Sequence, residues 1–363
     1  MGNLDFGTDR FATSRTLDQI QYLRGIAAMM VVLHHAVQRR PGFYSPLEES
    51  HFGRPGVLIF FVISGFVMMY ACRKERPATF AKRRIIRVVP IYWVMTLVFF
   101  LLLFRNDVAA GEPTRRLFEL LQSLLFIPHY HSAIETEIWP ILVPGWTLNY
   151  EMFFFLVFFI GILAGKPGPV AIAILLALVG LGLVVDSTDA LFVTWTNPFL
   201  LLFVAGILLA MLWRRTDFSR FVLLLPLGLG IAVIAAVNGL PESWIQPAFF
   251  AAGILTVAGT LALQDLRPSL VIPGLGAIGD ASYSIYLSHT ILMIPLYKAF
   301  AKLPLSGWPQ FLITLTLTLL LCALAGIAIH RRVEKPMIHW LRQRFDRPAG
   351  PSSTDTPEPR MTT

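Results

Sequence analysis

The chain has 363 residues, of which 55% are hydrophobic and only 14% are charged. Soluble domains carry about 25% charged residues, so this composition excludes an ordinary soluble domain and predicts an all-α, polytopic integral membrane helix bundle. The net charge of +8 could suggest a nucleic-acid-binding protein. However, the basic residues stand in short runs between apolar segments, as in membrane proteins, so we expect a lipid bilayer and no nucleic acid as a partner.

Apolar runs that approach the ~20 residues needed to cross a bilayer predict about ten transmembrane helices. They are 20–38, 56–72, 88–104, 145–165, 169–185, 197–213, 221–238, 245–263, 282–300 and 310–330. The polar start of the chain has no signal region, so we expect the first span to act as its own insertion signal. The predicted units are an N-terminal cytoplasmic segment (1–19), a transmembrane domain (20–345) and a disordered cytoplasmic tail (346–363).

The Lys and Arg residues predict how these spans are oriented. The loop 73–87 holds seven of the thirty, and the segments after the sixth and tenth spans add further basic residues. All of these fall on one side if both termini are cytoplasmic, which predicts a multi-pass protein of the cell inner (cytoplasmic) membrane. In the longest connection, 105–144, the run RRLFELLQSLLF fits an amphipathic helix on the outer surface.

The first span carries two costly polar residues, Arg24 and His35, on an otherwise apolar segment. Eleven residues turn an α-helix through three turns plus about 20° and climb about 16 Å, so both side chains share one face. Ionisable residues inside a membrane favour a functional role. The alternative is that Arg24 extends to the interface and His35 is a packed, hydrogen-bonded core residue.

The run PGWTLNYEMFFFLVF (144–158) places Glu151 in a span that begins on the outer side, at about the depth of His35. A carboxylate beside an imidazole fixes its tautomer and raises its basicity, as a general base requires. A structural ion pair of Glu151 with an arginine is the alternative. Trp146 and Tyr150 either support the substrate or are aromatic residues of the membrane interface.

The run FAKRRIIRVVPIYW (80–93) brings Arg83, Arg84 and Arg87 to the cytoplasmic side just before the third span. Guanidinium groups suit phosphates, so a phosphorylated donor could bind here. The alternative is that these arginines only determine the orientation of the span.

The run GDASYSIYLSH (279–289) places Ser282, Tyr286 and His289 on one polar helix face. Hydrogen bonding between helices is the alternative to a role in the site. Near the end of the chain, Glu334 is expected to neutralise one of the loop arginines, which is a structural role. The two cysteines offer no zinc-binding spacing, so we expect no metal.

These motifs, in this order, resemble the membrane-bound acyltransferase 3 family. The run LRGIAAMMVVLHH (23–35) looks like its R-x10-H signature. The later motifs are GVLIFFVISGF (56–66), FAKRRIIRVVPIYW (80–93), WTLNYEMFF (146–154), SYSIYLSH (282–289) and EKP (334–336). The resemblance covers nearly all of the predicted folded chain, and the short chain is similar to O-acetyltransferases of exopolysaccharides such as succinoglycan.

The resemblance implies transfer of an acyl group, expected to be acetyl, from acetyl-CoA to a hydroxyl of a carbohydrate outside the cytoplasm. It assigns Arg24 and His35 as the essential pair, Arg84 and Arg87 as the loop arginines, and Glu151 as the carboxylate. One motif departs from the family pattern G-V-D-x-F-F, because leucine stands at position 58 where that Asp is common.

Two hypotheses follow. In the first, the chain is an O-acyltransferase whose arginines hold the donor, while His35 is a general base or a brief acyl carrier. Its acceptor would be a polysaccharide or a lipid-linked oligosaccharide. In the second, the chain transports a polar or lipid-linked glycan and uses its intramembrane His, Arg and Glu as a relay. The sequence does not predict the oligomeric state.

Overall fold

The computed structural model describes residues 17–38, 42–109, 113–237 and 239–345. In these residues the chain forms helices and no strand, which confirms the predicted all-α class. The predicted tail, and the predicted N-terminal segment up to residue 16, lie outside the described residues.

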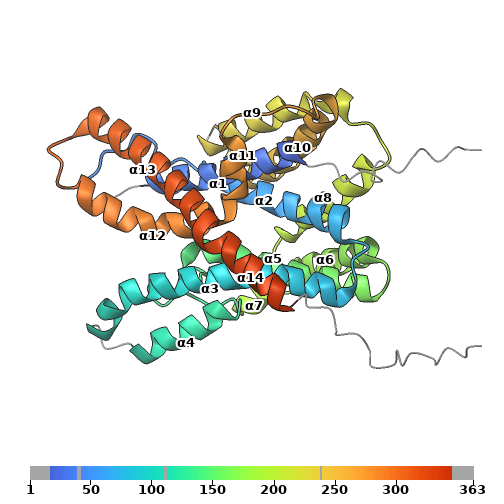
Figure 1. The fold of residues 1–363 in the computed structure, drawn as a ribbon, viewed down its shortest axis with the longest axis horizontal. Helices are drawn as coiled ribbons and strands as arrows, with labels where there is room; N and C mark the ends of the chain where they lie inside the picture. Colours follow the sequence, from blue (N-terminus) through green and yellow to red (C-terminus); the bar gives the residue numbers. More distant parts are fainter. Residues whose placement is uncertain (1–16, 39–41, 110–112, 238, 346–363) are drawn as a thin grey trace, which may run out of the picture.

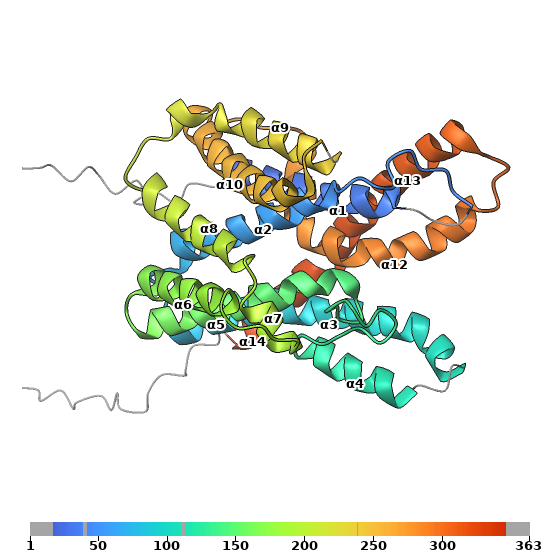
Figure 2. The ribbon, with the colours of Figure 1, turned by 180° about the vertical axis from the view of Figure 1, so that it is seen from behind.

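The helices form two groups, which Figures 1 and 2 show one above the other. The first group comprises α1 (Asp18–Val37), α2 (Gly53–Val67), α8 (Leu200–Trp213), α9 (Leu224–Ala236), α10 (Glu242–Leu266), α11 (Leu275–Asp280), α12 (Ser282–Phe300) and α13 (Gly307–Ile329). The second comprises α3 (Pro77–Ala109), α4 (Pro113–Leu124), α5 (Trp146–Leu163), α6 (Pro167–Gly182) and α7 (Ala190–Trp195). The last helix, α14 (Lys335–Phe345), crosses from the first group to α3 (Figure 1).

Eight helical segments of the described chain are long and apolar enough to cross a membrane. They are Asp18–Val37, Gly53–Cys72, Pro77–Leu103, Val143–Leu163, Ala190–Trp213, Ser219–Ala236, Glu242–Leu266 and Gly307–Phe345. The other two predicted spans are also helices. However, α6 has only 16 residues, and the first half of α12 is rich in Ser, Tyr and His.

One predicted boundary is wrong. The run 80–87, predicted as part of a loop, is helical because α3 begins at Pro77 and continues through Pro90. A proline at the first helical position favours such a start, and membrane helices tolerate internal prolines. The helix of the tenth predicted span, α13, ends at Ile329, next to the predicted end at 330, and a π-helical segment, His330–Glu334, joins it directly to α14. The amphipathic run RRLFELLQSLLF does form a helix, α4.

Glycines bring helices of the first group into close contact. A Cβ atom on Gly65 of α2 would lie 2.2 Å from the Phe203 carbonyl oxygen of α8, and one on Gly206 would lie 2.1 Å from the Val62 carbonyl oxygen. Small residues allow backbones to approach in this way in membrane bundles, where van der Waals packing is a main source of helix association. This contact holds α2, which carries part of the site, against α8.

Hydrogen bonds join the ends of different helices. The His51 amide donates to the Ala236 carbonyl oxygen at 2.8 Å, and the Tyr297 hydroxyl donates to the Ala36 carbonyl oxygen at 2.8 Å. Near the start of α3, Lys82 Nζ donates to the carbonyl oxygen of Phe345, the last residue of α14, at 2.9 Å.

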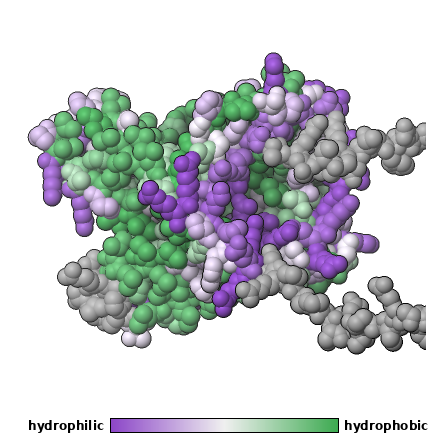
Figure 3. All heavy atoms as spheres, viewed as in Figure 1, coloured by the Kyte–Doolittle hydropathy of each residue, from purple (hydrophilic) through white to green (hydrophobic). Residues whose placement is uncertain are grey.

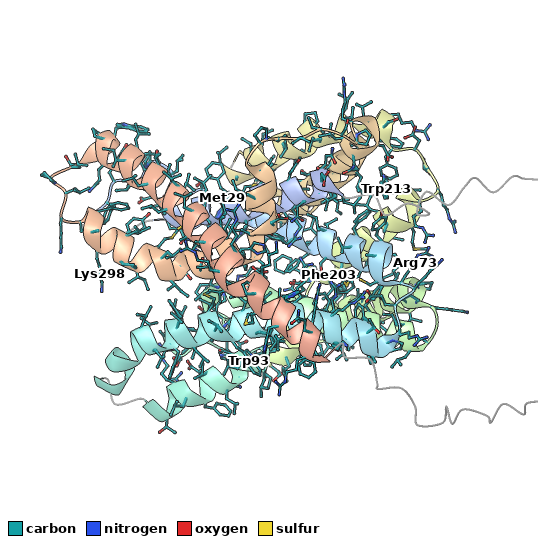
Figure 4. All side chains as sticks on the ribbon, viewed as in Figure 1. Met29, Arg73, Trp93, Phe203, Trp213 and Lys298 are labelled. Atoms are coloured by element: carbon teal, nitrogen blue, oxygen red, sulfur yellow. The ribbon has the colours of Figure 1, made fainter. Side chains whose placement is uncertain are left out.

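The two ends of the bundle differ in character. Arg73 and Trp213 lie toward one end and Lys298 toward the opposite end (Figure 4). On the face in Figure 3, hydrophilic side chains gather on the half nearer Arg73, and hydrophobic side chains cover much of the other half.

Candidate active site

A cavity of about 120 Å³ lies among α1, α2, α3, α5 and α12. It is lined by Arg24, Val57, Phe60, Phe61, Ile63, Ser64, Val67, Met68, Arg84, Arg87, Val88, Thr147, Leu148, Glu151, Phe155, Ser282, Tyr283 and Tyr286. Most of this wall is apolar, while its polar groups come from helices far apart in the sequence. The fold therefore assembles predicted site residues from four motifs around one space.

Three guanidinium groups face this cavity, those of Arg24, Arg84 and Arg87. Arg24 donates to Gln21 Oε1 at 3.1 Å. The guanidinium of Arg84 lies 5.9 Å from the centre of the Phe80 ring, and its buried Nε has no hydrogen-bond partner in the described chain. Unused guanidinium donors in an apolar surrounding favour an anionic ligand, because an unpaired buried charge is costly.

The third predicted arginine does not reach the cavity. Arg83 lies on the exposed side of α3 and forms an ion pair with Glu75, with an N···O distance of 2.6 Å. Successive residues of a helix point about 100° apart, so Arg83 and Arg84 cannot face the same space. The prediction that all three arginines share one site is therefore wrong for Arg83.

The carboxylate of Glu151 provides the negative charge of the cavity. Its Oε1 accepts a hydrogen bond from the Ser64 hydroxyl at 3.3 Å. The charges that act most strongly on it are those of Arg87 and Arg24. With three guanidinium groups and one carboxylate in the lining, the cavity is net positive.

A second carboxylate, that of Glu334, acts on the same arginines as Glu151. Glu334 is buried and accepts hydrogen bonds from the Ser284 hydroxyl at 2.5 Å and from His330 Nδ1 at 2.9 Å. Its charge also acts on Arg24 and Arg87. The π-helical segment places Glu334 here, and such segments are frequent at functional sites. This agrees with the predicted role of Glu334 in neutralising an arginine.

The α12 face of the cavity carries Ser282, Tyr283 and Tyr286. The Tyr286 hydroxyl donates to the Pro144 carbonyl oxygen at 2.9 Å and lies 2.9 Å from Thr147 Oγ1. The fully buried Ser282 hydroxyl has no hydrogen-bond partner among the described residues. Tyr286 is thus fixed in place, while Ser282 keeps its hydrogen-bonding capacity.

His35 lies in the last turn of α1, beyond the cavity lining. Its ring centroid is 5.1 Å from that of His289 on α12 and 5.3 Å from that of His34. His289 follows Tyr286 by one helical turn, and their ring centroids are 6.1 Å apart. Tyr286 therefore connects the cavity wall to a pair of imidazoles from α1 and α12.

Gln38 is a partner of His35 that the sequence reasoning missed. Its Oε1 lies 3.2 Å from His35 Nδ1, and its Nε2 lies 3.1 Å from His34 Nε2. An amide oxygen can only accept, so this contact puts the proton on Nδ1 of His35 and leaves the lone pair on Nε2. The signal was available, since Gln38 follows His35 by three residues, close to one helical turn.

The predicted contact between His35 and Glu151 is not formed. Glu151 belongs with Arg24, Arg87 and Ser64, whereas His35 belongs with His289 and Gln38. The prediction rested on similar depth along two helices, and depth does not determine which helices are lateral neighbours. Glu151 instead has the ionic surroundings that were the alternative interpretation.

Trp146 and Tyr150 lie behind the cavity wall and not in it. Their ring centroids lie 6.3 and 5.7 Å from that of Phe61, which lines the cavity, and 6.0 and 5.8 Å from that of Phe199. Tyr150 is buried. The two residues can support the site by packing against Phe61.

Comparisons with known proteins bear on what this site does. A family described as an acyltransferase domain matches residues 17–327, a range that contains the cavity and both imidazoles. The exopolysaccharide production protein ExoZ of Rhizobium meliloti is 37% identical over 318 residues, covering 83% of this chain and 96% of ExoZ. Acyltransferase MdmB of Streptomyces mycarofaciens is 25% identical over 389 residues, covering 95% of this chain and 98% of MdmB. No solved structure matches the chain.

Proposed function

The chain belongs to this family of acyltransferase domains, as its motifs predicted, and we propose that it transfers an acetyl group from acetyl-CoA to a hydroxyl of an exported carbohydrate. The observation that carries the proposal is the net positive cavity inside an apolar bundle, with a pair of imidazoles one helical turn beyond it. A phosphorylated acyl donor and a hydroxyl acceptor need these two kinds of group.

The arginine end of the cavity suits the donor. Coenzyme A carries several phosphate charges, and planar guanidinium groups bind phosphate oxygens with paired hydrogen bonds. Arg84 and Arg87 would hold these phosphates, with Arg24 above them on α1. The apolar walls formed by Val57, Phe60 and the other hydrophobic residues would then receive the acyl end of the thioester.

His35 would supply the base. With its Nδ1 proton donated to Gln38, Nε2 can accept the proton of the attacking hydroxyl. The hydroxyl oxygen forms a bond to the thioester carbonyl carbon, and the tetrahedral intermediate then loses the C–S bond. The proton passes from His35 to the thiolate sulfur of coenzyme A, so that the imidazole is neutral again at the end of the reaction.

The acceptor class is inferred from the similarity to ExoZ, a protein of exopolysaccharide production. We infer a polysaccharide or a lipid-linked oligosaccharide that meets the His35 side of the bundle. The corresponding topology has ten spans in the cell inner membrane, with both termini and the basic loops in the cytoplasm. The bias of Lys and Arg toward one side supports this orientation. The position of Arg73 and Trp213 at the end of the bundle opposite Lys298 (Figure 4) also supports it.

The test uses purified full-length protein in liposomes, with radiolabelled acetyl-CoA and surface oligosaccharide from the native host. We expect label to pass to the glycan, and His35→Ala to abolish the transfer. His339→Ala, a change at an exposed histidine of α14, is the matched control and should keep normal turnover. Near-normal transfer by His35→Ala would overturn the role of His35. Glycan uptake without acyl transfer would instead favour the transporter hypothesis.

A further inference from the structure

The guanidinium of Arg24 is held by a neighbour on its own helix. Gln21 stands three residues before Arg24, so the two side chains lie on the same face of α1, and Arg24 donates to Gln21 Oε1 at 3.1 Å. The Gln21 amide has a second partner, because its Nε2 donates to Asp280 Oδ1 at 2.7 Å. Asp280, Gln21 and Arg24 therefore form one hydrogen-bonded chain, and its last member lines the cavity.

Close packing of α11 on α1 brings Asp280 within reach of Gln21. A Cβ atom on Gly25 would lie 2.9 Å from the amide nitrogen of Gly279, and one on Gly279 would overlap the carbonyl oxygen of Gln21. Residues without a Cβ let two helix backbones approach this closely. Asp280 follows Gly279 and is the last residue of α11, so this contact sets its position relative to Gln21.

The chemistry of the two ends determines how the Gln21 amide is oriented. A carboxylate can only accept hydrogen bonds and a guanidinium can only donate them. The amide NH2 must therefore face Asp280, and the amide oxygen must face Arg24. The group in contact with the guanidinium is thus neutral, and the carboxylate lies one side chain further away. Of the three carboxylates whose charges act on this guanidinium, that of Asp280 acts most weakly, after Glu151 and Glu334.

We propose that Gln21 is a positioning residue that holds the Arg24 guanidinium at the cavity and keeps the Asp280 carboxylate from pairing with it, an inference that rests on the proposed acyl transfer. The charge of Arg24 and its other N–H donors then act on the phosphates of the acyl donor. Without the amide, the long Arg24 side chain is less ordered, and ordering it on binding costs free energy. With a carboxylate in contact, the guanidinium is already paired with an anion that competes with phosphate.

The sharpest test exchanges the amide and the carboxylate. The double variant Gln21→Glu with Asp280→Asn, here called the swapped pair, keeps the total charge and the side-chain sizes. The asparagine NH2 can donate to the new carboxylate, and Arg24 can also donate to it, so both hydrogen bonds of the chain are kept. What changes is that a carboxylate now contacts Arg24. A purely structural role in holding α11 on α1 predicts wild-type behaviour, whereas the proposal predicts weaker binding of the donor.

The measurements are KM and kcat for acetyl-CoA with full-length protein in liposomes, and Tm. We expect the swapped pair to raise KM by about tenfold, the effect of losing one charge-assisted hydrogen bond. Its kcat should stay within about twofold of wild type, because a group that only binds the donor acts on KM, and its Tm within about 2 °C. Gln343→Glu makes the same chemical change on the exposed side of α14 and should change neither constant.

Gln21→Met is the second variant, because it removes the amide without adding a charge. It has a similar length and loses both hydrogen bonds, so we expect KM to rise by about threefold to tenfold. Should the swapped pair fail to fold, this variant still decides the question.

Wild-type KM in either variant would overturn the proposal. So would a loss confined to kcat and Tm, since the chain would then only hold α11 on α1. Failure of the proposed function has a different signature, because the wild-type protein itself would then transfer no acetyl group in the same assay.

Discussion

Arg83 and Arg84 are adjacent in α3, but their side chains lie in different surroundings. Arg83 forms an ion pair with Glu75 on the exposed side of the helix, at 2.6 Å. Arg84 stacks on Phe80 and lines the cavity. One basic run therefore supplies both a surface ion pair and part of the proposed donor site.

This division predicts the effect of removing each arginine. Arg84→Gln and Arg87→Gln should each raise KM for acetyl-CoA by about tenfold to a hundredfold, the effect of losing one charge-assisted hydrogen bond. Arg83→Gln is the matched control and should change KM by less than about twofold, because exposed ion pairs contribute little. Steady-state kinetics in liposomes provide the measurement. A KM increase for Arg83→Gln as large as for Arg87→Gln would contradict the assignment.

Glu151 offers a second prediction, because its charge balances the cavity arginines. Glu151→Gln keeps an acceptor for Ser64 but removes the charge, so the ligand-free protein should lose roughly 1–3 kcal/mol of stability. A bound polyanion then relieves more repulsion than in wild type. The increase in Tm on adding coenzyme A should therefore be larger in the variant.

The control for this prediction is Glu119→Gln. Glu119 is also buried and pairs with Arg116 at 2.9 Å, but it lies outside the cavity. Its substitution should lower Tm without changing the shift caused by coenzyme A. A smaller shift in Glu151→Gln than in wild type would show that the carboxylate does not oppose the donor site charges.

The helices themselves could largely be predicted from apolar runs, since hydrophobic length sets a membrane span. The misplaced boundary at 80–87 has a physical cause. Arginines in 80–87 suggested a loop, but Phe80 and Ile86 are buried, and Arg84 and Arg87 line the cavity from the same continuous helix. Likewise, His330–Glu334 continues a helix through basic residues, with the buried Glu334 on its inner side.

The site could be predicted in part. Arg24, Arg84, Arg87 and Glu151 were each predicted as site residues, and they do share a cavity. Which polar residues touch depends on the lateral packing of helices, which periodicity and depth do not determine. This is why Glu151 was wrongly paired with His35, and why Gln38 was overlooked although it is close in sequence.

The glycine contact between α2 and α8 predicts a sharp difference between glycine sites. Gly65→Ala would place a Cβ 2.2 Å from the Phe203 carbonyl oxygen, so the helices must separate, at a cost of about 1–3 kcal/mol or more. Gly180→Ala in α6 is the matched control, because its Cβ would meet no atom within 4 Å. We expect a lower Tm and less folded protein in detergent for Gly65→Ala alone. Equal Tm values for the two variants would contradict close packing of these helices.

His131, in the connection between α4 and α5, predicts a pH dependence of stability. Burial, followed by the charge of Arg116, lowers the pKa of His131 below its ordinary value of 6.5, although Glu119 acts in the opposite direction. Its Nδ1 also accepts a hydrogen bond from the Ala133 amide at 3.2 Å, and protonation of Nδ1 would break that bond. Below about pH 6.5 the unfolded chain therefore binds a proton that the folded chain does not, and stability falls as the pH falls.

In His131→Asn, the amide oxygen can keep the acceptor without titrating. The difference in Tm between pH 7.5 and pH 5.5 should therefore be smaller than in wild type by up to ~2 °C, whereas His339→Asn should leave it unchanged. A difference as large in His131→Asn as in wild type would assign the acid sensitivity to other groups.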